Sequence, residues 1–242
     1  MKYKTLTAAL LLLTVLTSSI PLQSESYTKR INWLPEEKSQ PEEKAEESKE
    51  EIVEITVEPW PITKKQMGQI MGTTEAGISD QIMDDFARMV KLFELDKNNI
   101  AYFLGQVGAE SGGLKHTVEL DPGYRYEWRR DLGNYNQGDG VRYAGGGYLQ
   151  LTGRVNYTGF YKFMKANGVD DPKILSHGKH HVAKHYPWTS GGWWWMANGM
   201  IDYCKRNPSV DSVGARVNGR YLPNHYRARR HYTNKAFQIL SV

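Results

Sequence analysis

The segment from residue 36 to residue 51 most constrains how this chain can fold. It is dominated by glutamate and contains almost no apolar side chain. Such a sequence cannot bury enough apolar surface to offset the entropy lost on ordering. Residues 52–57 alternate between apolar and polar side chains in a way that fits a short strand. Pro59 and Pro61 then mark the boundary between this segment and the folded domain. We therefore predict an acidic low-complexity linker over residues 25–59 and one folded domain over residues 60–242.

The first 24 residues have the features of an export signal. Lys2 and Lys4 precede an apolar run over residues 6–16, and Pro21 follows. That run is short for a membrane-spanning helix, which needs about 20 predominantly apolar residues. We predict a cleaved signal peptide over residues 1–24, with an uncleaved signal anchor as the alternative. The protein would be exported to the periplasm or the extracellular space, and it would contact the membrane only transiently during export.

Charge and cysteine content limit the functional classes. Residues 36–58 hold ten Glu and three Lys, a net charge of −7, so the rest of the chain carries +11. A basic body favours an anionic partner, either nucleic acid or the bacterial cell wall with its peptide carboxylates. No nucleic-acid-binding motif is present, so we expect no nucleic-acid partner. Cys204 is the only cysteine, which excludes an intrachain disulfide and predicts a buried structural thiol.

The folded region has the apolar spacing of helices. Ser79 or Asp80 can cap a helix whose apolar residues recur over positions 82–93. A second helix is predicted over residues 99–109, and it places Glu110 at its end because Gly112 and Gly113 terminate it. Residues 123–153 are rich in Gly and Tyr and predict loops with a small β-hairpin. Further helices are predicted over residues 156–167, 178–186, 190–205, 209–217 and 224–240. The predicted fold class is mainly α with a minor β element.

Glu110 and Glu119 are candidates for a pair of catalytic carboxyl groups. Cleavage of a glycosidic bond uses one carboxyl group to protonate the leaving oxygen and a second to activate water or attack the sugar. The acid must hold a proton near neutral pH, so it should be partly buried against apolar walls. Glu110 follows an apolar helix, and Glu119 lies nine residues later in a loop. Taken alone, this pair is weak evidence for catalysis, because surface glutamates occur at such a spacing constantly.

Four blocks of sequence resemble the family 19 glycoside hydrolases, which comprise chitinases and related phage endolysins. Residues 101–113 and Glu119 resemble the catalytic helix of that family and the segment after the helix. Residues 143–157 resemble its Gly-rich signature, which ends in Gln-Leu-Thr-Gly-Arg-x-Asn-Tyr. Residues 189–200 resemble its aromatic core helix. Asn218 and Gly219, with Arg227 nine residues after Asn218, are similar to its Asn-Gly-to-Arg element. The blocks keep the order of the family and span residues 80–235.

The resemblance implies a lysozyme-like α-rich domain and an inverting mechanism. Glu110 would be the general acid and Glu119 the general base, with carboxyl groups about 6.5–9.5 Å apart. Thr152 would help to hold the water, and Arg227 would support the second carboxylate or the floor of the cleft. It implies neither a cofactor nor a metal. The substrate-binding residues would be Tyr148, Gln150, Thr152, Asn156, Asn218 and Arg227.

The sequence departs from the family at three positions. Ala144 and Gly146 stand where the Gly-rich block commonly carries Arg, and Ala109 stands where His often precedes the acid. These changes remove donors near the catalytic carboxylates. They keep open the alternative of a cell-wall-binding protein that has lost catalysis.

Other clusters have simpler explanations. His181 and His185 have the i, i+4 spacing of zinc ligands, but no third ligand lies at a diagnostic distance, so we expect a basic surface. Trp193, Trp194 and Trp195 point in different directions on one helix, which favours core packing over a sugar platform. The better candidates for stacking on sugar rings are Tyr124, Tyr126, Trp128 and Tyr135.

The sequence thus predicts an endo-acting, monomeric glycoside hydrolase whose partner is a polysaccharide. The basic domain and the simple architecture favour peptidoglycan as the substrate. A chitinase acting on chitin is the alternative within the enzyme class, and the catalytically degenerate wall binder is the alternative outside it.

Overall fold

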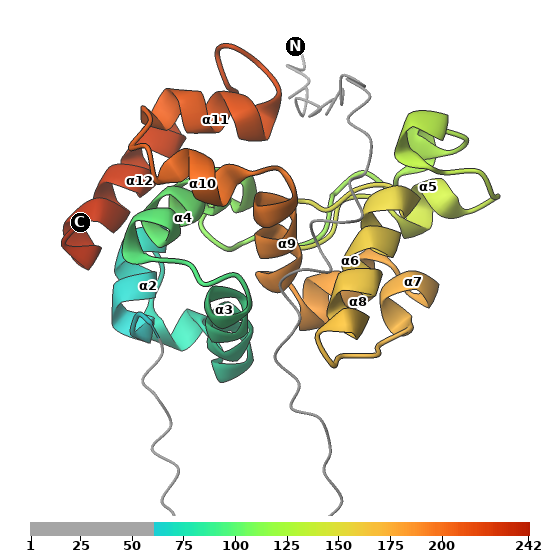
Figure 1. Cartoon of the computed structure of the whole chain (residues 1–242), viewed down its shortest axis with the longest axis horizontal. Coiled ribbons are helices and arrows are strands. Elements are labelled where there is room, and N and C mark those ends of the chain that lie inside the picture. The colour runs from blue at the N-terminus through green and yellow to red at the C-terminus, as the bar shows by residue number, and fades with distance from the viewer. Residues whose placement is uncertain (1–60) are drawn as a thin grey trace, which may run out of the picture. The chain divides into compact units, whose positions relative to one another are not determined.

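Helix α4 (Lys97–Ser111) is buried along most of its length in the computed structural model, which describes residues 61–242 (Figure 1). Every residue from Asn99 to Gly108 is buried. A helix that is apolar all round belongs in a core, and α4 occupies that place. The Asp96 side chain accepts a hydrogen bond from the Asn99 amide (2.7 Å), and Gly112 ends the helix at a left-handed φ of 63°.

Helix α12 (Tyr226–Leu240) packs against α4 at close range. A Cβ atom at Gly105 would lie 1.8 Å from Thr233 Oγ1, and one at Gly108 would lie 2.5 Å from the Tyr232 ring. The two glycines therefore permit an approach of the backbones that a larger residue would prevent. The same layer also contains α2 (Lys64–Met71), α10 (Met200–Cys204) and α11 (Val210–Asn218).

The carboxylate of Asp85 joins α3 (Asp80–Leu92) to the start of α9 (Thr189–Ala197). It accepts hydrogen bonds from the backbone amides of Trp188 (2.8 Å) and Thr189 (3.2 Å) and from the Thr189 hydroxyl (2.5 Å). These contacts satisfy amides at a helix start that have no partner within the helix. Asp85 is buried, and burial raises the pKa of its carboxyl.

A second apolar cluster lies among α6 (Arg154–Ala166), α7 (Lys173–Ser176) and α8 (Lys179–His185). Trp193 of α9 packs against both this cluster and the main core, so α9 links the two. Trp195 is fully buried in the main core. The packing role predicted for the tryptophan run is confirmed for these two residues.

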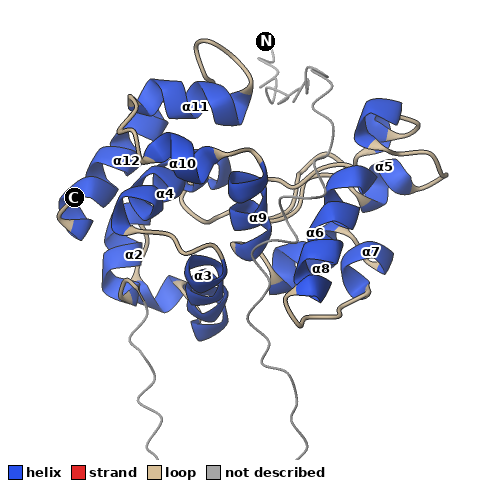
Figure 2. Cartoon of the chain, in the orientation of Figure 1, coloured by secondary structure: helices blue, strands red, loops and turns tan. Residues whose placement is uncertain are grey.

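The connection between α4 and α6 contains only short helical segments (Figure 2). These are η2 (Tyr124–Tyr126), η3 (Arg130–Leu132) and α5 (Asp139–Arg142). The predicted small β element is present only as two isolated antiparallel bridges, Val118 with Gly146 and Gly146 with Leu151. Gly146 takes part in both bridges, and a Cβ atom at this position would lie 2.6 Å from the Tyr157 hydroxyl.

The mainly α fold class is confirmed, with some differences in the helices. The predicted helix over residues 190–205 is interrupted at Gly199, whose φ is 66°. Helix α2 and the 3₁₀ segment η1 (Glu75–Gly77) were not predicted. Within residues 61–242, no helix is long and apolar enough to cross a membrane. The predicted signal over residues 1–24, the linker over 25–59 and the strand over 52–57 fall outside the described residues.

Candidate active site

Glu110 occupies the last turn of α4, next to the glycine that ends the helix. Its side chain is 8% exposed. The predicted burial of this carboxyl group is therefore found. The sequence predicted apolar surroundings for this carboxyl group. In the structure its hydrogen-bond partner is instead a cation.

That cation is Arg229, which is fully buried on α12. Its Nη2 donates a hydrogen bond to Glu110 Oε1, and its Nη1 donates to Gln106 Oε1 (2.7 Å). Its Nε donates to the carbonyl of Asn224 (2.9 Å). The guanidinium thus connects α4 to α12 and to the loop before α12. Such charge-assisted bonds are shorter and stronger than neutral ones.

Glu119 lies in the loop after α4, and both its oxygens accept hydrogen bonds. Oε1 accepts from Arg125 Nη2 and from the hydroxyl of Tyr126 (2.9 Å). Oε2 accepts from the backbone amide of Gly145 (3.0 Å). The backbone amide of Glu119 in turn donates to the carbonyl of Gly145 (2.9 Å). The carboxylate is therefore fixed from two sides, and its side chain is 16% exposed.

The Gly-rich block places three predicted residues close to this anchor of Glu119. A Cβ atom at Gly145 would lie 2.3 Å from Gln150 Oε1, so the Gln150 side chain lies directly against the glycine that binds Glu119. The hydroxyl of Thr152 donates to the Gln150 carbonyl (2.8 Å). Asn156 Nδ2 donates to the Thr152 carbonyl (2.8 Å). These three residues are partly exposed.

Tyr148, the fourth predicted residue of that block, is placed differently. Its ring is 1% exposed and packs against Trp188 with the ring centroids 4.4 Å apart. Burial raises its pKa, and so does the charge of Asp85. The ring of Tyr148 thus belongs to the core, and its predicted contact with the substrate finds no support in this placement.

Asn218 joins the network around Glu110. Its Oδ1 accepts a hydrogen bond from the Asn224 amide (2.9 Å), and the Asn224 carbonyl binds Arg229. Asn218 Nδ2 is buried and has no hydrogen-bond partner within residues 61–242. A buried donor in this state is costly unless another molecule supplies an acceptor.

The prediction for Arg227 requires a correction. Arg227 is exposed, and its Nε donates to the hydroxyl of the neighbouring Tyr226 (3.2 Å). The arginine that reaches Glu110 is Arg229, two residues later. On a helix, two residues are separated by about 200° of rotation, so the two side chains leave opposite faces.

The aromatic residues of the loop after Glu119 divide into two kinds. Tyr126 is buried and donates to Glu119. The others are among the most exposed aromatic side chains of the described chain, as expected for surfaces that stack on sugar rings. They are Tyr124, Trp128 and Tyr135, at 73%, 61% and 59% exposure.

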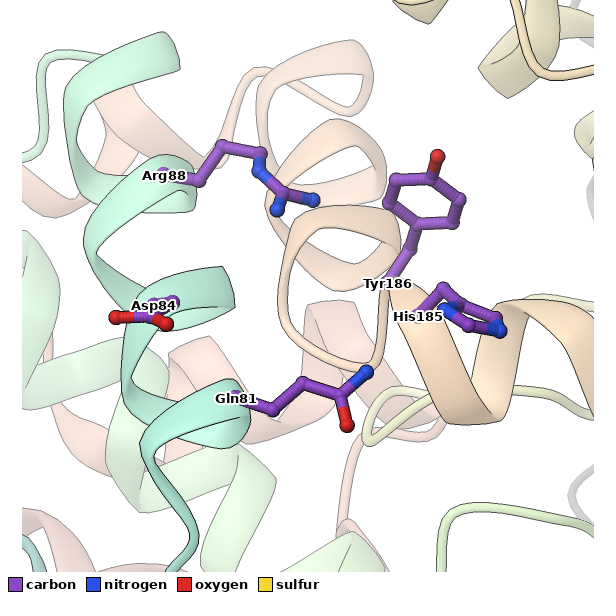
Figure 3. Close-up of a pocket in the computed structure, with 5 residues that line it drawn as sticks. All are labelled: Gln81, Asp84, Arg88, His185 and Tyr186. Atoms are coloured by element: carbon purple, nitrogen blue, oxygen red, sulfur yellow. The ribbon is translucent and has the colours of Figure 1, made fainter.

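A pocket of about 250 Å³ lies elsewhere, between α3 and the end of α8 (Figure 3). It is lined by Gln81, Asp84, Arg88, His185 and Tyr186, and the Arg88 guanidinium lies 5.6 Å from the centre of the Tyr186 ring. No predicted site residue lines this pocket. Across the described part of the chain, no three His, Cys, Asp or Glu side chains are arranged to hold a metal ion.

Comparison with known proteins places the fold. No protein-family model matches the chain. Chitinase C from Streptomyces griseus is similar in structure at 17% sequence identity and a TM-score of 0.56, covering 76% of this chain and 94% of that chain. A class IV family GH19 chitinase from Zea mays is similar at 19% identity and a TM-score of 0.57, covering 75% and 94%.

A bacterial family 19 chitinase is also similar, at 19% identity and a TM-score of 0.59, covering 75% of this chain and 96% of that chain. The α-rich fold expected from the sequence resemblance is therefore confirmed. The chain has the fold of family 19 chitinases.

Proposed function

We propose that this protein is an inverting, endo-acting glycoside hydrolase that cleaves β-1,4 bonds in a cell-wall polymer containing N-acetylglucosamine. One observation carries the proposal. Both glutamates singled out by the sequence are held in place by an arginine, Glu110 by Arg229 and Glu119 by Arg125. This arrangement lies within a fold that chitinases of family 19 share. We further propose that the protein is exported and acts as a monomer.

In the proposed mechanism, Glu119 accepts a proton from a water molecule as the water oxygen attacks the anomeric carbon. The bond from that carbon to the bridging oxygen breaks, and Glu110 transfers its proton to the departing oxygen. The products are two shorter chains, and the new reducing end has inverted configuration. Both carboxyl groups then return to their starting states by exchange with solvent.

Arg229 fits this mechanism as a stabiliser of the carboxylate that remains after Glu110 has delivered its proton. It occupies Oε1, and no other described side chain bonds to the Glu110 carboxyl group. Oε2 is therefore the oxygen to carry the proton. A fixed positive charge beside a group that becomes negative during the reaction lowers the energy of the transition state.

Sugar binding is proposed for the groups with free hydrogen-bonding capacity near the two glutamates. Asn218 Nδ2 is buried without an acceptor in the described chain, so a sugar acetamide or hydroxyl oxygen would complete it. Gln150, Thr152 and Asn156 would supply further contacts beside Glu119. The exposed rings of Tyr124, Trp128 and Tyr135 would stack on sugar faces, as aromatic rings do on apolar surfaces.

Peptidoglycan is the preferred substrate because of the charge of the chain. Outside residues 36–58 the net charge is +11, and the peptide carboxylates of peptidoglycan are negative whereas chitin is uncharged. The alternative of a chitinase rests on the structural neighbours, which are chitinases by name. If charge drives wall binding, the rate of wall lysis falls steeply with added salt, while the rate on chitin oligomers stays flat.

Substitution of each glutamate tests the proposal. Glu110→Gln and Glu119→Gln should each abolish release of soluble fragments from the polymer that the wild type cleaves, with binding to that polymer retained. Glu75→Gln, at an exposed position of η1, is the matched control and should keep full activity. Wild-type binding to the wall without any cleavage would establish the degenerate binder instead.

A further inference from the structure

We propose that Arg125 is the positioning residue for the catalytic base, and that Oε2 of Glu119 is the oxygen that takes the proton from water. This inference rests on the proposed function, which assigns the base to Glu119. It goes further, because neither the sequence blocks nor the comparisons single out Arg125.

The contacts of Glu119 Oε1 leave that oxygen no capacity to act as a base. Arg125 Nη2 and the Tyr126 hydroxyl both donate to it, and Arg125 Nη2 also donates to the Tyr126 hydroxyl oxygen (2.9 Å). The three groups form a closed triangle of hydrogen bonds. A carboxylate oxygen has two lone-pair directions, so both directions of Oε1 are occupied.

Oε2 is in a different state. It accepts one hydrogen bond, from the Gly145 amide (3.0 Å), which leaves its second lone pair free within the described chain. The reciprocal bond from the Glu119 amide to the Gly145 carbonyl (2.9 Å) fixes the distance between the two backbones. The carboxylate therefore presents one accepting direction, and the Gln150 side chain lies against Gly145, the residue that binds Oε2.

Tyr126 keeps its role as a donor over the whole working range of pH. Burial and the nearby charge of Glu119 raise the pKa of Tyr126 to about 12. The phenol thus stays protonated at neutral pH and can donate to Oε1. The Arg125 guanidinium also lies over its ring, 4.8 Å from the ring centre, which adds a cation–π contact.

The surrounding packing explains why the cation comes from position 125. The sequence lacks arginine at positions 144 and 146, and the structure leaves no room for one there. A Cβ atom at Gly146 would lie 2.6 Å from the Tyr157 hydroxyl and 3.0 Å from Lys179 Cα. Ala144 is fully buried in a small apolar cluster with Tyr126. A positive group can therefore reach Glu119 from the side of η2, where Arg125 lies.

The contact with Glu119 is specific to Arg125, because Arg129 in the same loop has a different partner. Arg129 pairs with Asp131 in an exposed ion pair. The two arginines are four residues apart in the same loop, carry the same charge and differ in contact with Glu119. Arg129 is thus the matched control for any effect of general charge or loop stability.

The test compares Arg125→Gln, Arg125→Lys and Arg129→Gln in the full chain, on the polymer that the wild type cleaves. We expect Arg125→Gln to lower kcat by about 100-fold, in line with loss of an oriented general base, with KM changed by less than about twofold. Arg125→Lys should have a kcat at least about tenfold higher than that of Arg125→Gln, because lysine restores the positive charge although it lacks the planar guanidinium. Arg129→Gln should match the wild type.

A second variant guards against a folding defect. Tyr126→Phe removes one donor from Oε1 and keeps Arg125, so it should lower kcat less than Arg125→Gln does. The melting temperatures of all variants are measured alongside. A loss in Arg125→Gln that only equals that of Arg129→Gln, or one that Arg125→Lys does not recover at all, would overturn the inference. If the wild type cleaves neither peptidoglycan nor chitin, the proposed function fails, and the inference fails with it.

Discussion

Arg229 on the last helix forms a buried ion pair with Glu110 at the end of the central helix. The pair links two segments that lie 119 residues apart in sequence. The guanidinium is fully buried, and Gln106 and the Asn224 carbonyl each accept a further hydrogen bond from it. The position of the proposed catalytic acid is therefore coupled directly to the packing of α12 on α4.

This coupling predicts a large loss of stability on substitution of Arg229. Arg229→Gln removes the buried cation that Glu110, Gln106 and the Asn224 carbonyl share, and loss of one member of a buried charged network typically costs about 3–5 kcal/mol. Arg230→Gln is the control, because Arg230 pairs with Asp211 in an exposed ion pair, and such pairs contribute little to stability. Urea unfolding followed by circular dichroism measures both. Equal losses for the two variants would contradict the buried pair.

The ion pair of buried Asp139 with partly exposed Arg154 predicts a pH dependence of stability. Burial alone would raise the pKa of Asp139, but hydrogen bonds from Arg154 and from the amides of Asn136 and Tyr135 outweigh it and lower the pKa below the usual 3.8. A folded-state pKa below the unfolded one gives stability that is present above pH 3.8. That stability is lost as the pH falls through the folded-state pKa.

Asp139→Asn should therefore cost about 1.5–3 kcal/mol near pH 7, with the difference from the wild type shrinking as the pH falls below about 3.8. The free energy of unfolding between pH 7 and pH 2.5 measures this, wherever the protein remains reversible. Asp202→Asn is the control, since its pair with Lys205 is exposed. A difference that stays constant down to the lowest pH would contradict the assignment.

The close packing of α4 and α12 predicts an unusual effect of Gly105→Ala. In an open helix position this change would stabilise the protein by about 1 kcal/mol through helix propensity. Here the added Cβ atom would meet Thr233 Oγ1 at 1.8 Å and force the helices apart. We expect a loss of about 1–3 kcal/mol, as for other overpacked cores. A gain in melting temperature would contradict the packing of these helices.

The thiol of Cys204 should be unreactive in the folded protein. Burial, with the charge of Asp96 as a smaller cause, raises the pKa of Cys204 to about 12. The thiolate is the reactive form, so little of it exists at pH 8. Iodoacetamide should modify the folded chain at least about 100-fold more slowly than the chain in urea. Similar rates in the two states would show that the thiol is accessible.

The local sequence was sufficient to predict α4 and the position of Glu110 at the end of it. Asp96 caps α4 and Gly112 ends it, so the end of the helix is determined by neighbours in sequence. The extent of the small β element was harder to predict, and it amounts to two isolated bridges, because several glycines of residues 123–153 permit close packing of the backbone. A Cβ atom at Gly123, for example, would lie 2.5 Å from the Gly140 carbonyl oxygen.

Arg229 and Arg125 were not predicted as the partners of the two glutamates, although the sequence pattern around Arg229 could have indicated its burial. Arg229 has the same helical spacing as the buried residues Thr233, Ala236 and Leu240, whereas Arg227 does not. A basic residue on a buried stripe indicates a buried partner. Arg125 left no such signal, because it lies on a 3₁₀ turn whose contacts depend on the course of the surrounding loops.

Product analysis is the measurement that tests the central claim most directly. The wild type, Glu110→Gln and Glu119→Gln are incubated separately with purified peptidoglycan and with soluble chitin oligomers, and the products are identified by mass spectrometry. We predict fragments with new reducing ends from peptidoglycan with the wild type, and none with either variant. Fragments from chitin alone would identify a chitinase instead. Wild-type protein that cleaves neither polymer, or a Glu110→Gln variant as active as the wild type, would contradict the proposed mechanism.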